Sequence, residues 1–381
     1  MHADQSIWRT PEAALPAPAI GPLSGLRFSI MDLFAVTGQR LGAGNPTRLA
    51  EAHPEPESAA IVSQLLAAGA MPVGITHLDE FAYSLTGVNE HYGTPPNPLA
   101  PDRIGGGSSS GVASSVSTGA CEIGLGADTA GSIRVPAAFQ GLHGLRTTHG
   151  SVSAAGVLPL APSLDTIGWM TRDALTLARV TEAVFAGVPA RPLDHIAVSA
   201  GLIAAADREV GDAIWGFVDG RMLGLPRRDI DHDLPLDHWR QVMATVLGYE
   251  AWQHHGEWIT SHPGSLGAEI AGRFMSAQRI TPEEYAAAVA EMASARTAIR
   301  ALVGDDVLVV PSASSVPPRR DTPGAYAAAR IATHNLTCLA SLAGLPAVSL
   351  PLRTAAGLPV GVSLIGPPHS DRALVALATV L

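Results

Sequence analysis

The sequence predicts an α/β protein, and three observations lead to this fold class. Apolar residues recur at helical spacing over residues 56–70, and an apolar strand follows over residues 71–76, with Gly69 at the junction. Helix and strand alternate again in the C-terminal part of the chain. Hydrophobic residues make up 47% of the 381 residues and charged residues 15%. This composition supplies a sizeable core and excludes a largely disordered chain.

The predicted elements follow one another along the chain. They are a strand over 26–31, a helix within 56–70, a strand over 71–76, a Gly- and Ser-rich segment over 105–153, a mostly helical region over 190–300, a strand over 306–311, a helix over 327–343, strands over 345–350 and 358–365, and a helix over 370–381. The segments that form strands lie toward both ends of the chain. A single domain is therefore favoured, with the helical middle as an excursion from its sheet.

Charge and composition exclude several classes of function. The formal net charge is −10, the pI is about 5.7 and aromatic residues make up 5%, which argues against a surface that binds nucleic acid or an anionic membrane. The two cysteines, Cys121 and Cys338, are too few for a disulfide framework. Residues 1–9 lack an apolar signal-peptide core, and no apolar stretch is long enough to span a bilayer. We therefore expect a cytoplasmic location.

The Gly- and Ser-rich segment admits more than one interpretation. Residues 105–118 read GGGSSSGVASSVST, which is typical of a flexible linker. Residues 124–141 interleave glycines with apolar and charged residues, which favours turns whose free amides hold an anion. A phosphate-binding loop is excluded because the chain contains no Lys. A nucleophile elbow at 107–111 fits the letters GxSxG, but the preceding 97–103 is Pro-rich where a strand is required. A serine-based acyl-transfer site is the third interpretation.

These residues resemble the amidase signature family. The family's GGSS block is met at 106–109, and its G-x-D-x-x-G-S-[IV]-R-x-P block is met at 126–136. The resemblance continues upstream at 79–82 and 89–98, and downstream at 344–366. Within the family, the chain is most similar to the short plant-type amidases that act on indole-3-acetamide.

The resemblance implies a fold and a set of site residues. The fold is an α/β sandwich in which helices enclose a mixed, mostly parallel twisted sheet. Its single domain would have a core over 25–180, a helical cap over 190–300 and a sheet completed by 301–381. Ser132 would be the acyl nucleophile. Ser108, 24 residues earlier, would sit on a cis peptide and shuttle the proton, and Ser109 would support it. The oxyanion hole would be formed by the backbone amides of Thr129, Ala130 and Gly131.

Two further residues of the second block are expected to support the nucleophile. Asp128 and Arg134 would brace the Ser132 loop through hydrogen bonds. Ala130 stands where the family commonly has Gly, so the oxyanion hole is expected to distort if that position needs a positive φ.

The third catalytic residue of the family is a Lys, and its position here is occupied by Met31. A thioether has no titratable proton, so Met31 cannot accept a proton from Ser108. General acid–base catalysis is worth about 10²–10⁴-fold, so the ordinary mechanism should be crippled. The sequence leaves open whether Met31 is natural or replaces a Lys by design.

Histidines are the candidates for a substitute base. These candidates are His91, His143 and His149, because imidazole titrates near neutral pH. A packed, structural role is favoured for His143, and His149 matches a His of the plant-type amidases that retain the Lys. The cluster of Asp231, His232, Asp233 and His238 has no standard metal spacing, so no metal is predicted. The aromatic residues within 239–258 are expected in a core or along the substrate funnel.

Two functions follow as hypotheses. The first is hydrolysis of a small linear aryl or alkyl carboxamide through a serine acyl-enzyme, weakened by the absence of Lys. The alternative is a dead or repurposed homologue that binds an amide or acid ligand, or performs acyl transfer or cyclisation. Neither requires a cofactor, and the partner is a small molecule, not nucleic acid or a membrane. The sequence leaves the substrate and a homodimer open.

Overall fold

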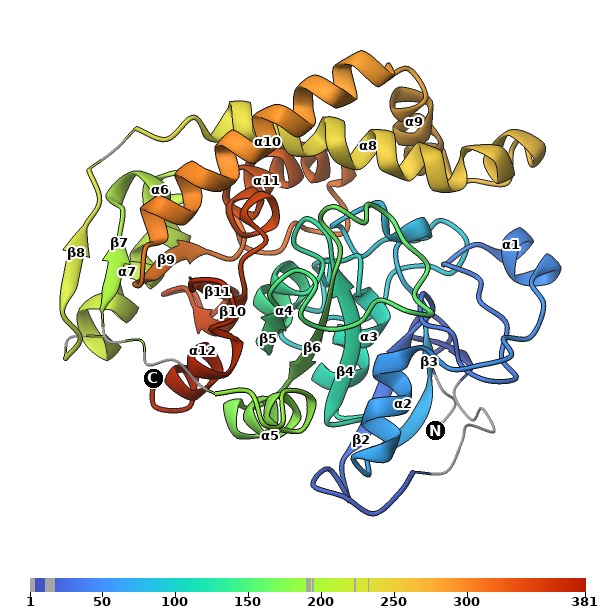
Figure 1. Ribbon diagram of the computed structural model, residues 1–381, viewed down its shortest axis with the longest axis horizontal. Coiled ribbons are helices and arrows are strands. Elements are labelled where there is room, and N and C mark those ends of the chain that lie inside the picture. The colour runs from blue at the N-terminus through green and yellow to red at the C-terminus, as the bar shows by residue number, and fades with distance from the viewer. Residues whose placement is uncertain (1–3, 11–17, 190–192, 194, 223, 232) are drawn as a thin grey trace.

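One large mixed sheet forms the centre of the molecule (Figure 1). The computed structural model describes residues 4–10, 18–189, 193, 195–222, 224–231 and 233–381. The strands among these residues form a single sheet of eleven. In spatial order they are β1 (Trp8–Thr10), β3 (Met71–Thr76), β2 (Arg27–Met31), β4 (Ile123–Asp128), β6 (Thr166–Thr171), β5 (His143–Arg146), β10 (Ala347–Arg353), β11 (Pro359–Ile365), β9 (Val307–Pro311), β7 (Ile196–Val198) and β8 (Arg227–Asp229).

Strands from the two ends of the chain meet in the middle of this sheet. β5 pairs with β10, so that Arg146 lies opposite Ala347 and Leu145 opposite Val348. The strands predicted at both ends of the chain are present, and β3 spans the residues predicted for it. The α/β class and the mixed sheet are therefore confirmed.

The prediction of a mostly parallel sheet is wrong in its proportions. Among the described strands, four pairings are parallel, all of them in the outer parts of the sheet at β2, β3, β4 and at β7, β8, β9. Six are antiparallel, including the consecutive pairs β5–β6 and β10–β11. β10 and β11 are joined by the short turn 354–358, which only an antiparallel pair permits.

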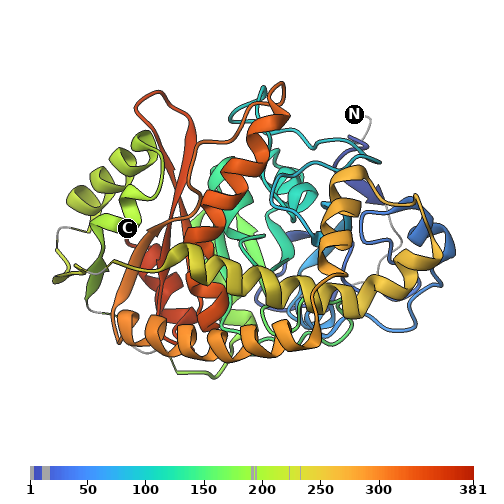
Figure 2. The ribbon, with the colours of Figure 1, turned by 90° about the horizontal axis from the view of Figure 1, so that it is seen from above.

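Helices cover both faces of the sheet. They are α1 (Pro46–Glu51), α2 (Ala60–Ala67), α3 (Ser110–Ser117), α4 (Arg134–Gln140), α5 (Ala174–Val184), α6 (Ala200–Ala204), α7 (Arg208–Arg221), α8 (Leu236–Ser261), α9 (Ala268–Ala277), α10 (Pro282–Val303), α11 (Tyr326–Ala343) and α12 (Asp371–Ala378). Figure 1 shows α8, α10 and α11 together on one side and α5 with α12 on the opposite side. The long helices α8 and α10 run side by side in Figure 2.

The region 190–300 is helical only in part. β7 and β8 extend the sheet beyond β9, and α6 and α7 lie between them in the chain. Each of these strands has only three residues, too few for a period-two pattern to separate strand from helix. The helices α8, α9 and α10 that follow form the long helical part that the sequence predicted.

Candidate active site

The Ser132 loop joins the end of β4 to the start of α4. β4 is buried along its whole length and ends at Asp128, and α4 begins at Arg134. Gly131 has a φ of 130°, a conformation that favours glycine. Ser132 itself is only 4% exposed. A serine hydroxyl is thus held on a short buried loop at the end of a central strand.

The Ser108 segment lies just before α3. The Gly107–Ser108 peptide is cis, as the family resemblance implied. The amide of Asp79 donates to the Ser108 carbonyl oxygen at 3.1 Å. A Cβ on Gly107 would lie 2.4 Å from the Asp79 carboxylate oxygens, so a side chain at that position would displace the carboxylate. Within the described residues, the buried Ser108 hydroxyl has no hydrogen-bond partner.

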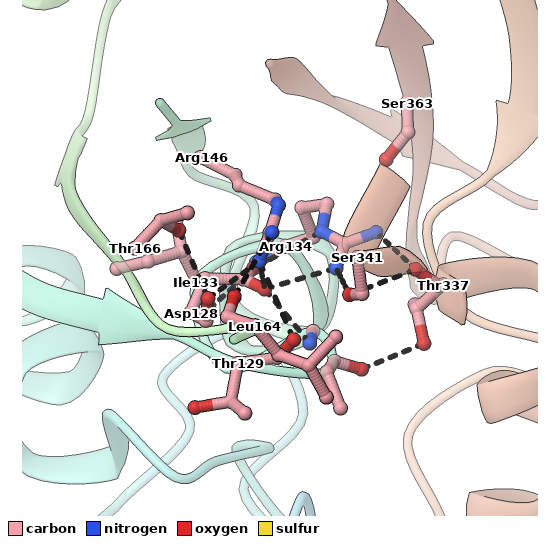
Figure 3. Close-up of polar contacts among 12 residues, drawn as sticks. Asp128, Thr129, Ile133, Arg134, Arg146, Leu164, Thr166, Thr337, Ser341 and Ser363 are labelled. Carbon is pink, nitrogen blue, oxygen red and sulfur yellow. Dashed lines mark hydrogen bonds and ion pairs between the residues drawn. The ribbon is translucent and has the colours of Figure 1, made fainter. Parts of the chain in front are cut away.

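Asp128 braces the Ser132 loop, as predicted from the sequence (Figure 3). Its Oδ1 accepts from the Gly131 amide, from Arg134 Nη2 and from Arg146 Nη1, each at 2.9 Å. Its Oδ2 accepts from Arg134 Nε at 3.0 Å and from the Ile133 amide at 3.2 Å. The carboxylate and both guanidinium groups are buried. The loop is therefore fixed by a carboxylate whose oxygens are fully used.

The charge of Asp128 is stabilised by its partners despite complete burial. Burial alone would raise the pKa of Asp128, but the guanidinium groups of Arg134 and Arg146 hold it well below the usual range. Arg146 was not singled out from the sequence. Its Nη1 also donates to the Asp128 carbonyl oxygen at 2.5 Å, so one arginine fixes both the backbone and the side chain at the end of β4.

The three amides predicted for an oxyanion hole differ in availability. The Gly131 amide is committed to Asp128. Within the described residues, the amides of Thr129 and Ala130 donate no hydrogen bond. Ala130 does not adopt a positive φ, so replacing the family's Gly imposes no backbone strain there. Two free amide donors therefore remain on the loop beside Ser132.

Met31 contacts the serine pair through Ser109. Met31 is the last residue of β2 and is fully buried. The Ser109 hydroxyl lies 3.4 Å from Met31 Sδ and 3.3 Å from the Ala127 carbonyl oxygen, and it can donate to either. The end of β2 thus approaches the Ser108 segment, as the family resemblance implied. The contact offers a weak sulfur acceptor and no titratable group.

Two cavities adjoin the serine pair. One, of about 360 Å³, is lined by Ser108 and mainly by apolar side chains, among them Leu33, Val157 and Ile167. The other, of about 30 Å³, is lined by Ser132. Both cavities are bordered by the same three residues, which are Ala82, Thr129 and Leu160. A ligand that reached both serines would therefore pass Thr129.

Thr129 is itself held by a residue that the sequence analysis missed. The Thr129 hydroxyl donates to Asp165 Oδ1 at 2.5 Å. The other oxygen, Asp165 Oδ2, accepts from the amides of Leu160 and Ala161. Burial raises the pKa of the Asp165 carboxyl. Asp165 stands 33 residues beyond Ser132, and only the pairing of β4 with β6 brings it back to the loop.

Arginines on the Ser132 side were also missed. Arg273 from α9 and Arg330 from α11 line the small cavity together with His334. The sequence did contain a signal for Arg330 and His334. Arg330 is the sole Asp, Glu, Lys or Arg residue of α11, and His334 follows it by one helical turn. Such a pair on one face of a helix of otherwise small and apolar residues marks a buried polar site.

The candidate base histidines have different surroundings. His143 lies at the start of β5 opposite Thr171, at the end of the sheet away from Asp128, so it is not part of the site. His91 Nε2 is paired with Glu80 at 2.9 Å. His149 lines the larger cavity, and its Nε2 lies 2.8 Å from the Pro162 carbonyl oxygen. Of the three, His149 alone borders the cavity that holds Ser108.

The remaining predicted features lie outside the site. Trp239 is buried in the core, and Tyr249 stacks on Tyr285 with ring centroids 4.2 Å apart. None of the aromatic residues within 239–258 borders the two cavities. His232 lies outside the described residues, and His238 pairs with Glu291 at 3.5 Å. In the described ranges, no cluster of three His, Cys, Asp or Glu side chains is arranged to hold a metal ion.

Comparison with known proteins supports the interpretation of these motifs. The family model described as Amidase matches residues 4–211 and 252–375. Amidase 1 of Arabidopsis thaliana is 34% identical over 93% of this chain and 92% of its own length. The chloroplastic Outer envelope protein 64 of Arabidopsis thaliana is 30% identical over 98% of this chain and 68% of its own. A crystal structure of an amidase superposes with a TM-score of 0.85, at 30% identity over 94% of this chain and 84% of its own.

In the part of the chain that the structure covers, none of the helices combines the length and apolar character needed to cross a bilayer. The family match extends over most of the chain, and it includes both serine blocks and the strands that carry them. The chain therefore belongs to the amidase signature family.

Proposed function

We propose that this chain hydrolyses small carboxamides through an acyl-enzyme on Ser132. The observation that carries the proposal is that Ser108 and Ser132 are buried on adjoining cavities with a shared border. The brace on Asp128 supports it further, because a nucleophile must be held within a few tenths of an ångström of its productive position.

In the proposed reaction, Ser132 Oγ attacks the amide carbon and the carbonyl electrons move to the oxygen. The free amides of Thr129 and Ala130 stabilise that oxyanion, and one such donor is typically worth about 3–4 kcal/mol. The Ser132 proton passes to Ser108 and then to the nitrogen as the C–N bond breaks and the amine leaves. Water hydrolyses the resulting ester, which releases the acid and restores the Ser132 hydroxyl.

We infer that Met31 occupies the position of the family's catalytic Lys. Its buried thioether contacts Ser109, and Ser108 has no partner in the described residues that could receive a proton. The relay therefore ends at a hydroxyl whose pKa is far above neutrality. Hydrolysis is expected to be slow, by about the 10²–10⁴-fold that general acid–base catalysis contributes.

A second candidate function is ligand binding without hydrolysis, or acyl transfer or cyclisation that needs no strong base. The same unpartnered Ser108 hydroxyl favours it, because nothing nearby activates that oxygen. The larger of the two cavities beside the serines is lined mainly by apolar side chains. This lining suits an aryl or alkyl amide, or the corresponding acid, as the ligand for either function. A small-molecule partner and a cytoplasmic location remain predictions.

Covalent labelling tests whether Ser132 is nucleophilic. The full chain is incubated for hours with a fluorophosphonate, and the modified peptide is identified by mass spectrometry. We expect an adduct on Ser132 and none in the Ser132→Ala variant. Ser153→Ala is the matched control, because Ser153 borders the larger cavity and has no role in the proposed chemistry. A folded protein with no adduct on Ser132 contradicts the acyl-enzyme proposal and favours the binding function.

A further inference from the structure

Arg330 lies on the face of α11 that borders the Ser132 loop. Four residues of that helix follow one another at three- and four-residue spacing, which places them on one face. They are Arg330, His334, Thr337 and Ser341. The Thr337 hydroxyl donates to the Ala130 carbonyl oxygen at 2.7 Å. Arg330 stands seven residues before Thr337, or about 10 Å along the helix.

Arg330 has no counter-ion. In the described part of the chain it makes no hydrogen bond and no ion pair, and its Nε is buried without an acceptor. Its neighbours are satisfied, since Arg273 bonds to Glu269 and the Tyr83 carbonyl oxygen, and Arg240 bonds to Asp237. A guanidinium whose Nε is buried without an acceptor is costly for the free protein, so the charge of Arg330 indicates an anionic ligand.

The groups around Arg330 reinforce this polarity. Burial lowers the pKa of His334 well below its usual range, so the imidazole is neutral at pH 7. Burial raises the pKa of Tyr83 to about 12, so its hydroxyl remains a donor. The small Ser132 cavity adjoins a third cavity, of about 660 Å³. Both of these cavities are bordered by Arg330, Arg273 and Tyr83. Glu269 also lines the larger of these cavities and is paired with Arg273, so this route to Ser132 carries one net positive charge, that of Arg330.

The Ser108 side has the opposite character. The cavity that Ser108 lines is bordered mainly by aliphatic side chains and contains no arginine among its lining residues. In the proposed reaction, Ser132 bonds to the acyl carbon and Ser108 serves the leaving nitrogen. The charged cavity therefore faces the acyl part of the substrate, and the apolar cavity faces the amine part.

We propose that Arg330 binds a carboxylate on the acyl part of the substrate, which is then a monoamide of a dicarboxylic acid with an apolar amine. This inference rests on the proposed function for its orientation. About 10 Å between Arg330 and Thr337 leaves room for an arginine side chain and a linker of two or three methylenes. Hydrolysis adds one water across the C–N bond and releases a dicarboxylate and the amine.

Calorimetric titration of the full chain tests the carboxylate site without requiring turnover. The probes are N-benzylsuccinamate and the neutral analogue in which a methyl ketone replaces the carboxylate. A charge-assisted bond to a buried guanidinium should make the acid bind at least about 10-fold more tightly than the ketone. In Arg330→Gln that preference should fall to about 2-fold or less, and Arg330→Lys should restore part of it.

Arg279→Gln is the matched control, because Arg279 is exposed at the end of α9 and should leave the preference unchanged. Equal binding of acid and ketone to the natural chain overturns the proposal, and so does a preference that survives in Arg330→Gln. The comparison of the two probes on the natural chain decides the matter even if the variant fails to fold.

A reversed amide tests the orientation. N-phenylacetyl-β-alanine carries its carboxylate on the amine part, and we expect it to bind more weakly than N-benzylsuccinamate. Equal or tighter binding overturns the assignment of Arg330 to the acyl side. Failure of the proposed function appears separately, as absence of the fluorophosphonate adduct on Ser132 while the preference for the acid persists.

Discussion

The two serines of the site are each supported by a buried aspartate, and the two aspartates have opposite surroundings. Asp128 beneath Ser132 is paired with Arg134 and Arg146, and its pKa is held well below the usual range. Asp79 beside Ser108 accepts from the Gly87 amide at 2.9 Å, and its other oxygen has no hydrogen-bond partner in the described residues.

The difference lies in the cations. Burial raises the pKa of Asp79 to about 6, and the hydrogen bond from the Gly87 amide and the charge of Arg273 offset this desolvation only in part. The nucleophile side of the site thus keeps a carboxylate paired with two arginines, whereas, among the described residues, Asp79 on the proton-relay side has no ion pair. This asymmetry is what the proposed replacement of a Lys by Met31 would leave behind.

The largest expected effect comes from giving the relay side a cation. Met31→Lys should raise amide hydrolysis by about 10²–10⁴-fold, because an amine at the end of β2 can exchange a proton with the serine pair. Initial rates on an aryl acetamide measure the gain. Met275→Lys is the control, since Met275 is 58% exposed and lines neither cavity. No gain would mean that the pocket has been repurposed.

Removing the carboxylate that braces the Ser132 loop should destabilise the folded protein. Asp128→Asn leaves two buried guanidinium groups without their carboxylate, and we expect the free energy of unfolding to fall by about 3–5 kcal/mol. Urea unfolding measures it. Asp237→Asn removes an exposed, solvent-screened partner of Arg240 and should lower the free energy of unfolding far less. Similar losses in the two variants would contradict the assignment of Asp128 as the brace.

A pH series separates the two aspartates. Because the folded pKa of Asp79 is raised from 3.8 to about 6, its contribution to stability is present below pH 4 and is lost as pH rises through 6. Asp79→Asn does not titrate, so its stability relative to the natural chain should improve by up to about 3 kcal/mol between pH 4 and pH 7.

Asp128 is expected to show the opposite sign. Its folded pKa is lowered, so its contribution is present above pH 4 and is lost only in strong acid. Unfolding free energies of the natural chain, Asp79→Asn and Asp128→Asn, measured from strong acid to pH 7, test both statements. If the difference in unfolding free energy between the natural chain and Asp79→Asn does not change with pH, burial does not raise the pKa of Asp79.

The smallest expected effect concerns the loop that carries the free amides. Thr337→Val removes the hydrogen bond to the Ala130 carbonyl oxygen and should lower the free energy of unfolding by about 1 kcal/mol. Thr297→Val is its control, because the Thr297 hydroxyl bonds within its own helix at an exposed position. Equal changes in the two variants would mean that α11 does not hold the Ser132 loop.

Local pattern was enough to predict much of the fold and part of the site. The apolar run over 71–76 predicted β3. The resemblance of the Gly- and Ser-rich blocks to the amidase signature implied that Ser108 and Ser132 belong to one site and that Met31 approaches it. An apolar run and a block of adjacent residues are features that a sequence displays directly.

Long-range pairing decided the rest. His143 was a candidate base because imidazole titrates near neutral pH, yet the pairing of β5 with β6 puts it about 17 Å of strand away from the Asp128 end. Arg146, Asp165 and Arg330 join the site from positions that no local pattern connects to Ser132.

By itself, the sequence determined that this is an α/β chain with two serine blocks and no lysine to serve them. Only the tertiary structure decided which buried charges stand beside each serine and that Arg330 stands there unpaired. The physical reason is that periodicity reports the face a residue occupies on its own helix or strand. The energy of a buried charge depends instead on partners brought in by the sheet order and by the packing of α11, which no single segment encodes.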